Sequence, residues 1–92
     1  MQLARFLNSV FNKDGFILVD ANSKSYIIGN PKKENPIKLK ILNKKLHYKL
    51  LFHPDLYFGE AYTDGEITIE NGSLTDFLDL ALMNFGRGDL NF

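Results

Sequence analysis

The sequence predicts an α+β domain in which helices pack on one face of a small antiparallel or mixed sheet. Residues 2–12 and 74–85 carry apolar side chains at helical spacing. Residues 37–41 and 66–70 instead alternate apolar and polar side chains, which is typical of half-buried strands. The order is helix, three strands, one or two helices, strand and helix, without internal repeats.

The first half of the chain is expected to form one helix and then three strands. The apolar stripe of the helix consists of Leu3, Phe6, Leu7, Val10 and Phe11. Residues 16–19 and 25–29 are β-prone runs separated by polar residues, which suggests a hairpin. Together with the strand at 37–41, they are expected to form an antiparallel meander.

The second half is expected to contain two or three helices and one strand. Asn43 is placed to cap a helix over 44–52, although the pattern of residues 46–50 is also compatible with an extended conformation. Proline is tolerated in a first helical turn, so residues 54–63 predict a short further helix. Ser73 fits the N-cap of the last helix.

Length and composition limit what the chain contains. Its 92 residues leave room for one domain, expected over residues 1–86, with 87–92 as a tail or the start of a linker. The absence of cysteine excludes disulfide scaffolds, thiolate zinc sites and cysteine nucleophiles. No signal peptide or long apolar run is present, so we expect a cytoplasmic protein.

The charges are segregated although the net charge is zero. Seven of the eleven basic residues lie between Lys32 and Lys49, whereas Asp55 to Asp89 holds eight acidic residues and one basic residue. The basic stretch is either a solvated face or a surface for anionic membranes, to which each lysine contributes about 1 kcal/mol. Nucleic acid is not expected, because no aromatic residue alternates with the lysines on strand 37–41. The candidate membrane-facing residues are Lys38, Lys40, Lys44, Lys45 and Lys49.

The sequence predicts no catalytic, cofactor or metal site within this chain. His47 and His53 are six positions apart and match no zinc-binding spacing. Glu60, Asp64 and Glu66 form the densest carboxylate group. They can be interpreted as an acid–base or cation site, or as the turn that precedes a strand, and the turn is favoured.

The most specific pattern in the chain begins at Phe58. It reads Gly59-Glu60-Ala61-Tyr62-Thr63-Asp64-Gly65-Glu66, followed by a strand and then Leu74-Thr75-Asp76-Phe77. This arrangement resembles the N-terminal domain of cyclopropane-fatty-acyl-phospholipid synthases, in which a similar motif precedes a leucine-rich helix. The family often has Met at the position of Thr63 and Trp at that of Ile67. The signature residues, expected to be structural, are Gly59, Glu60, Tyr62, Asp64, Gly65 and Glu66.

The resemblance implies a function that the residue patterns alone do not. Enzymes of this family transfer a methyl group from S-adenosylmethionine to the double bond of an acyl chain in a phospholipid. That chemistry belongs to a C-terminal methyltransferase domain, so the cofactor is expected there and not in these 92 residues. The N-terminal domain is expected to have a sterol-carrier-protein-like fold. It would engage the lipid or the anionic membrane surface from the inner face, or assemble with the methyltransferase domain.

Two alternatives from other functional classes stay open. One is a stand-alone lipid carrier, in which the last helix would line an apolar cavity. The other is a homodimerisation module. The candidate lipid-facing residues are Phe77, Leu78, Leu82 and Phe85, although stripes of this kind more often belong to a hydrophobic core.

Overall fold

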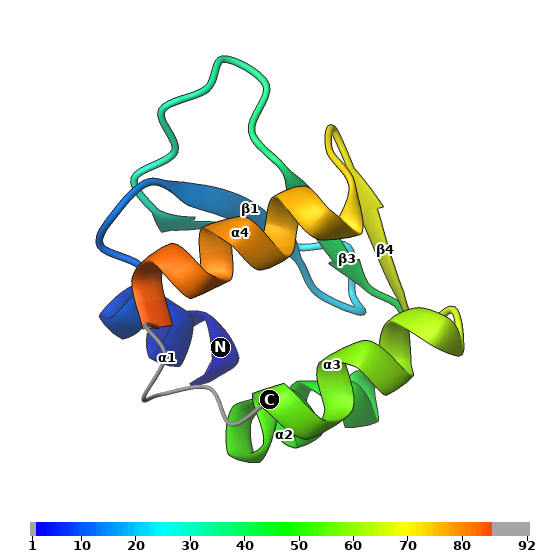
Figure 1. The fold of residues 1–92 in the computed structure, drawn as a ribbon. Helices are drawn as coiled ribbons and strands as arrows, with labels where there is room; N and C mark the ends of the chain where they lie inside the picture. Colours follow the sequence, from blue (N-terminus) through cyan, green and yellow to red (C-terminus); the bar gives the residue numbers. More distant parts are fainter. Residues whose placement is uncertain (1, 86–92) are drawn as a thin grey trace.

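The computed structural model describes residues 2–85, apart from the side chains of residues 54–56 and 85, and it forms one α+β domain (Figure 1). The tail expected at 87–92 lies outside the described residues. The element order confirms the predicted fold class. The elements are α1 (Gln2–Val10), β1 (Gly15–Val19), β2 (Ser25–Gly29), β3 (Lys38–Ile41), α2 (Lys44–Phe52), α3 (Pro54–Thr63), β4 (Ile67–Glu70) and α4 (Leu74–Phe85).

The sheet is mixed, and its strand order is β2-β1-β3-β4. β1 pairs with β2 and β3 with β4 in antiparallel fashion, whereas β1 and β3 are parallel. The expected antiparallel meander is therefore wrong for the third strand. The connection between β2 and β3 is long enough to cross to the far side of β1, where the N–H of Ile17 donates to the carbonyl of Ile37 at 2.8 Å.

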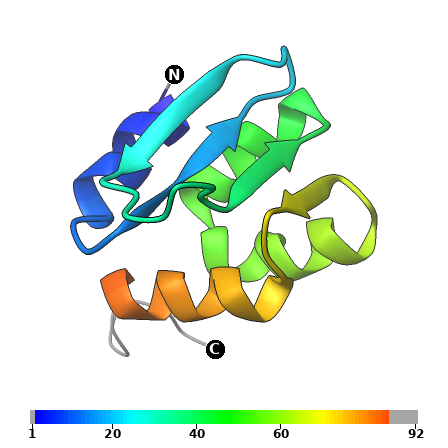
Figure 2. The same ribbon diagram turned by 90° about the horizontal axis from the view of Figure 1, so that it is seen from above.

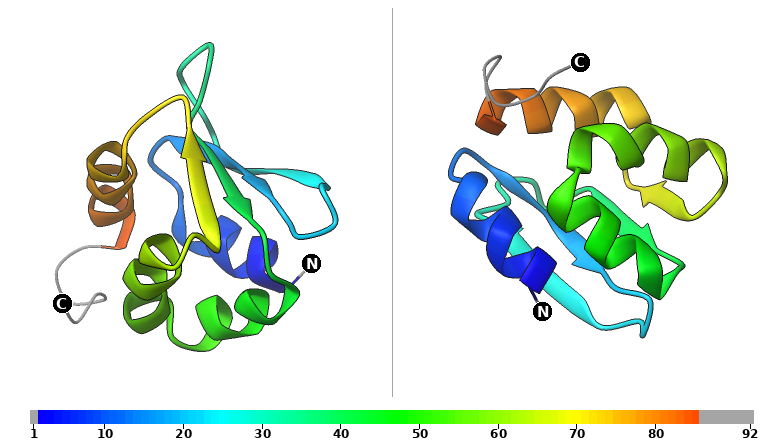
Figure 3. Two further views of the ribbon diagram at one scale, coloured as in Figure 1. Left: turned by 90° about the vertical axis from the view of Figure 1, so that its right-hand side faces the viewer. Right: turned by 90° about the horizontal axis from the view of Figure 1, so that it is seen from below.

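One face of the sheet carries the hydrophobic core. The strand register places Leu18 of β1 beside Tyr26 of β2 and Leu39 of β3 on this face. Side chains from the helices pack against it and exclude water from a single cluster. In the view from below, α1 and α2 lie in front of the strands (Figure 3). The largest fully buried side chains are Phe11, Phe16, Leu3, Leu18, Ile28, Ile41, Leu46 and Ile67.

Within residues 2–85, no helix covers the opposite face of the sheet. Seen from above, the strands lie in front of α1 and α2 (Figure 2). The register places Ile17, Ile27 and Lys38 in one row across β1, β2 and β3 on this face. Ile27 is 66% exposed. We call this the open sheet face. The prediction that helices pack on one face is thus confirmed.

α1 is tied to the outer edge of the sheet by one side chain. The side-chain oxygen of Asn8 accepts a hydrogen bond from the N–H of Gly29 at 2.8 Å. Its amide nitrogen donates to the carbonyl of Ile27 at 3.3 Å. These two bonds satisfy main-chain groups of β2 that point away from β1, because β2 is the edge strand on that side.

The predicted helix caps are present. The side-chain oxygen of Asn43 accepts from the N–H of Lys45 at 3.0 Å, so residues 44–52 are helical and not extended. At α4, the N–H of Asp76 donates to the Ser73 hydroxyl at 3.1 Å, and the N–H of Ser73 donates to the Asp76 carboxylate at 2.9 Å. This reciprocal pair is a capping box, with Ser73 as the N-cap that the sequence predicts.

Candidate functional site

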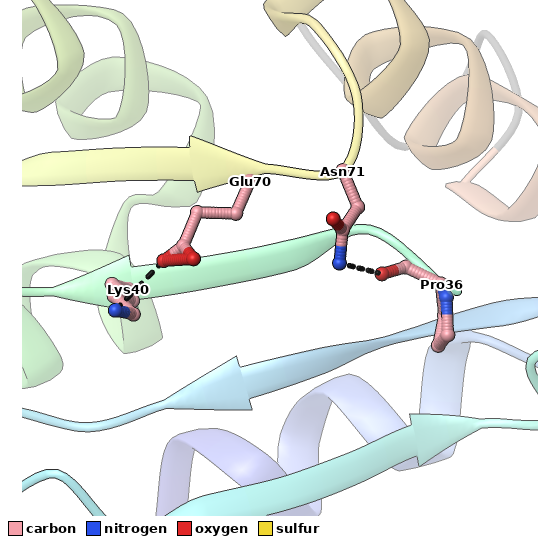
Figure 4. A network of polar contacts seen from close by, with 4 residues as sticks. All are labelled: Pro36, Lys40, Glu70 and Asn71. Atoms are coloured by element: carbon pink, nitrogen blue, oxygen red, sulfur yellow. Dashed lines mark hydrogen bonds and ion pairs between the residues drawn. The ribbon is translucent and has the colours of Figure 1, made fainter.

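The five candidate lysines do not share one surface. Lys38 and Lys40 project from β3 onto the open sheet face, where the Nζ of Lys40 lies 2.7 Å from a carboxylate oxygen of Glu70 on β4. Figure 4 shows this ion pair beside the hydrogen bond from the Asn71 amide to the carbonyl of Pro36. The other three lysines lie on α2, beyond the corner where β3 ends. The positive charge of Lys40 is therefore already balanced by the carboxylate of Glu70.

The exposed side of α2 combines lysines with aromatic rings. Leu46 and Leu50 face the core, and the helical period places positions 44, 45, 48 and 52 on the opposite side. Lys49 lies on the flank, with its Nζ 5.3 Å from the centre of the Tyr57 ring. Tyr48 is 64% exposed and Phe52 is 71% exposed, four residues apart on one side of the helix. We call this region the α2 surface. Its members are Lys44, Lys45, Tyr48, Lys49 and Phe52.

The two aromatic residues were missed by the sequence analysis. Apolar side chains occur on both sides of this helix, so periodicity alone does not tell which side is buried. The N-cap at Asn43 and the lysines supply the missing signal. Once the helix is fixed and Leu46 and Leu50 are assigned to the core, Tyr48 and Phe52 must lie among the lysines.

The signature segment forms a helix end, a turn and the start of a strand. The N–H of Asp64 donates to the carbonyl of Glu60 at 2.9 Å and thereby ends α3. Gly65 follows with φ +76°, a conformation that favours glycine. Gly59 accepts a hydrogen bond from the Thr63 hydroxyl at 3.0 Å, and Tyr62 is partly exposed.

Glu66 connects the signature segment to α2. Its N–H donates to the carbonyl of Ala61 and its carbonyl accepts from the N–H of Leu42 at 2.8 Å. A carboxylate oxygen accepts from the side-chain amide of Asn43 at 3.2 Å. One residue thus joins the end of α3, the start of β4 and the N-cap of α2. Among the residues that the structure describes, no group of His, Asp or Glu side chains is arranged to hold a metal ion.

The four candidate lipid-facing residues of α4 are not gathered around one cavity. Phe77 is 6% exposed and packs edge-on against Phe16, with ring centroids 5.1 Å apart. It also stacks on Phe58 at 5.2 Å. Leu82 is 44% exposed, while Leu78 is half-buried. The side chain of Phe85 lies outside the described residues.

A cavity beside α4 is too polar to hold an acyl chain. It has a volume of about 270 Å³ and lies between α4 and the loop before β3. Leu80 and Met83 contribute apolar atoms, but Asp14, Asp76 and Lys33 line it as well. Burying charged groups against a hydrocarbon chain is unfavourable, so this cavity does not favour a lipid carrier.

A polar cluster that sequence reasoning did not find joins β1, β2 and α2. Asp20 is buried, and one carboxylate oxygen accepts from the N–H groups of Asn22 and Lys24, both at 2.9 Å. The other accepts from the Tyr26 hydroxyl at 3.2 Å. The Nε2 atom of His47 accepts from the N–H of Ala21 at 3.3 Å. These bonds fix the tight turn between β1 and β2 against α2.

The same contacts shift two pKa values. Burial works to raise the pKa of Asp20, but the hydrogen bonds from Lys24, Asn22 and Tyr26 and the nearby His47 lower it below its usual value. Burial lowers the pKa of His47; Asp20 opposes this effect and Lys44 adds to it. Asp20 is therefore a carboxylate and His47 a neutral imidazole near pH 7.

Comparison with known proteins leaves the chain without an assigned family. No family model matches the sequence, and no curated protein matches it either. Within residues 2–85, no helix combines the length and apolar character that crossing a bilayer requires.

Proposed function

We propose that this chain is a non-catalytic accessory domain that binds anionic membrane surfaces through the α2 surface. The observation that supports this most is the exposure of Tyr48 and Phe52 among Lys44, Lys45 and Lys49. Aromatic rings enter the boundary between headgroups and acyl chains, while lysines reach the phosphates with their flexible stems. An ordinary solvated helix face would need only the lysines.

The expected free energy of membrane binding is that of reversible attachment. Three lysines contribute about 3 kcal/mol near an anionic surface. Partial burial of the two aromatic side chains adds about 1–3 kcal/mol each. The total is comparable to that of a single lipid anchor, which gives only marginal membrane binding by itself. The α2 surface is thus suited to a protein that has a second attachment or a larger catalytic partner.

The larger partner that we propose is a methyltransferase domain. The signature segment Phe58–Glu66 resembles the N-terminal domain of cyclopropane-fatty-acyl-phospholipid synthases. A sterol-carrier-like domain at the membrane would place that enzyme beside its phospholipid substrate, on the inner face of the membrane. S-adenosylmethionine would then bind the partner domain. With labelled S-adenosylmethionine and unsaturated phospholipid, we expect the isolated chain to transfer no methyl group; robust transfer would contradict the accessory role.

Vesicle binding tests the α2 surface directly. We expect the chain to co-sediment with vesicles of anionic phospholipid more than with neutral vesicles, and salt to weaken the binding because it screens exposed charges. Replacing Phe52 by Ala, or both Lys45 and Lys49 by Glu, should reduce binding about tenfold or more.

A matched control separates the α2 surface from net charge. Lys32 and Lys33 are exposed lysines in the loop before β3, outside α2. The change of both to Glu alters the net charge as much as the double change on α2 does. If the loop variant loses as much binding as the α2 variant, attraction is non-specific and the proposed surface is wrong.

The structure offers less support for a lipid carrier than for the accessory role. A carrier would hold an acyl chain beneath α4, but Phe77 fills that position between Phe16 and Phe58. Saturable displacement of a fluorescent fatty acid would favour the carrier over the accessory role. Homodimerisation is tested by sedimentation at several concentrations.

A further inference from the structure

A notch next to the α2 surface is lined by hydrogen-bond donors. It lies between α1 and α2 and has a volume of about 310 Å³. That volume is at the lower end of the range of about 300–1,000 Å³ for ligand pockets, which suits a small polar group and not an acyl chain. Its lining residues are Gln2, Leu3, His47, Tyr48 and Leu51.

The hydrogen bond of His47 determines what its ring offers to a ligand. Because Nε2 accepts from the N–H of Ala21, the neutral ring carries its proton on Nδ1. Nδ1–H is the ring's remaining polar group, and it is a donor. The amide of Gln2 and the hydroxyl of Tyr48 are further donors in the same lining.

Two charged side chains, Asp20 and Lys44, act on the His47 ring beside the notch. None of the described residues that line the notch carries a carboxylate. Of the two charges that act on the ring, Asp20 has the larger effect and Lys44 the smaller. The acid that faces His47 is Asp20, on the side of the turn between β1 and β2. Its oxygens already accept hydrogen bonds from two N–H groups and from the Tyr26 hydroxyl. Asp20 is thus occupied on the side of the turn, and the donors of the lining, not the nearby charges, favour a phosphate group.

We propose that this notch binds a phosphate group, supplied by an anionic lipid at the membrane surface that α2 contacts. Tyr48 belongs to both the notch and the α2 surface, so a headgroup beside the helix can reach the donors without any rearrangement of the fold. The inference rests on the proposed membrane function, because it names the lipid group that this surface selects.

The first experiment tests the notch without a membrane. Inorganic phosphate is added to the full chain, and the ring nitrogen and carbon signals of both histidines are followed by NMR. We expect saturable shifts for His47 and none for His53, which does not line the notch. Gln2→Ala, at an exposed position, should weaken phosphate binding about tenfold while leaving the rest of the spectrum unchanged. Unchanged His47 signals would overturn the inference.

The second experiment separates the notch from the α2 surface. Vesicles with equal negative charge are made with either phosphatidic acid or oleate as the anionic component. Wild type should prefer phosphatidic acid, and Gln2→Ala should lose this preference but still bind both kinds of vesicle. If wild type binds both kinds of vesicle equally well, the membrane function stands and the phosphate site is wrong. Phosphate shifts at His47 without vesicle binding support the site but overturn the membrane function, and they identify free phosphate as the ligand's source.

Discussion

At the scale of single residues, His47 links the turn between β1 and β2 to α2 through one hydrogen bond. Its Nε2 atom must be unprotonated to accept from the N–H of Ala21 at 3.3 Å. The charged groups that act on the ring are Asp20 and Lys44. Protonation would turn Nε2 into a donor that faces another donor, and because the pKa of His47 is lowered, this contact is lost only below the usual pKa of histidine.

The pH dependence of stability follows from the lowered pKa of His47. In the unfolded chain the pKa returns to about 6.5, so between that value and the folded pKa the unfolded state binds more protons. Stability should therefore decrease as pH falls below about 6.5. Denaturant unfolding of wild type and His47→Gln at several pH values measures this effect, with His53→Gln as the control. An equal pH response in wild type and His47→Gln would show that another group is responsible.

At the scale of elements, α2 was predicted by its N-cap, but the composition of its outer surface was not. Caps are local features, so Asn43 could be recognised from the sequence. The contact of Asn43 with Glu66 could not, because it joins positions that are 23 residues apart in the chain. The role of Glu66 as a connector depends on the tertiary position of β4.

The cap of α2 gives a prediction about stability. Asn43→Ala removes an acceptor for the N–H of Lys45 and a donor to Glu66, so it should destabilise the domain by about 1–2 kcal/mol. Asn43→Asp keeps the acceptor but places a second carboxylate beside Glu66. A double-mutant cycle with Glu66→Ala isolates the contact, and a coupling energy of zero would show that Asn43 acts only as a cap.

At the scale of the whole molecule, the sequence predicted the elements and the one-sided helix layer, but it did not predict the strand order. Alternation in residues 37–41 identifies a strand and its buried face, yet says nothing about which neighbour it joins. Parallel pairing of β1 with β3 depends on a connection that crosses the sheet. The Asp20 cluster was missed for the same reason, since its partners are assembled from β1, β2 and α2.

Because the core is small, Phe77 is expected to contribute a large share of the domain's free energy of unfolding. A domain of this size has a total stability of about 5–14 kcal/mol. Phe77→Ala should remove about 3–5 kcal/mol, because it leaves a cavity between Phe16 and Phe58. Leu82→Ala, on the exposed side of α4, should change stability by less than about 1 kcal/mol. Thermal unfolding compares the two, and a small effect of Phe77→Ala would favour a lipid-lining role over a core role.

The bonds from Asn8 to the outer side of β2 have a consequence for association between copies of the chain. An uncovered edge strand is a template on which the strand of another molecule can add, and repeated addition leads to aggregation. The side-chain amide of Asn8 accepts a hydrogen bond from the N–H of Gly29 and donates one to the carbonyl of Ile27. The main chain of an incoming strand would make the same two kinds of bond. Because Ile27 also exposes an apolar side chain beside this edge, a single asparagine on α1 protects a border of the sheet to which another strand could add.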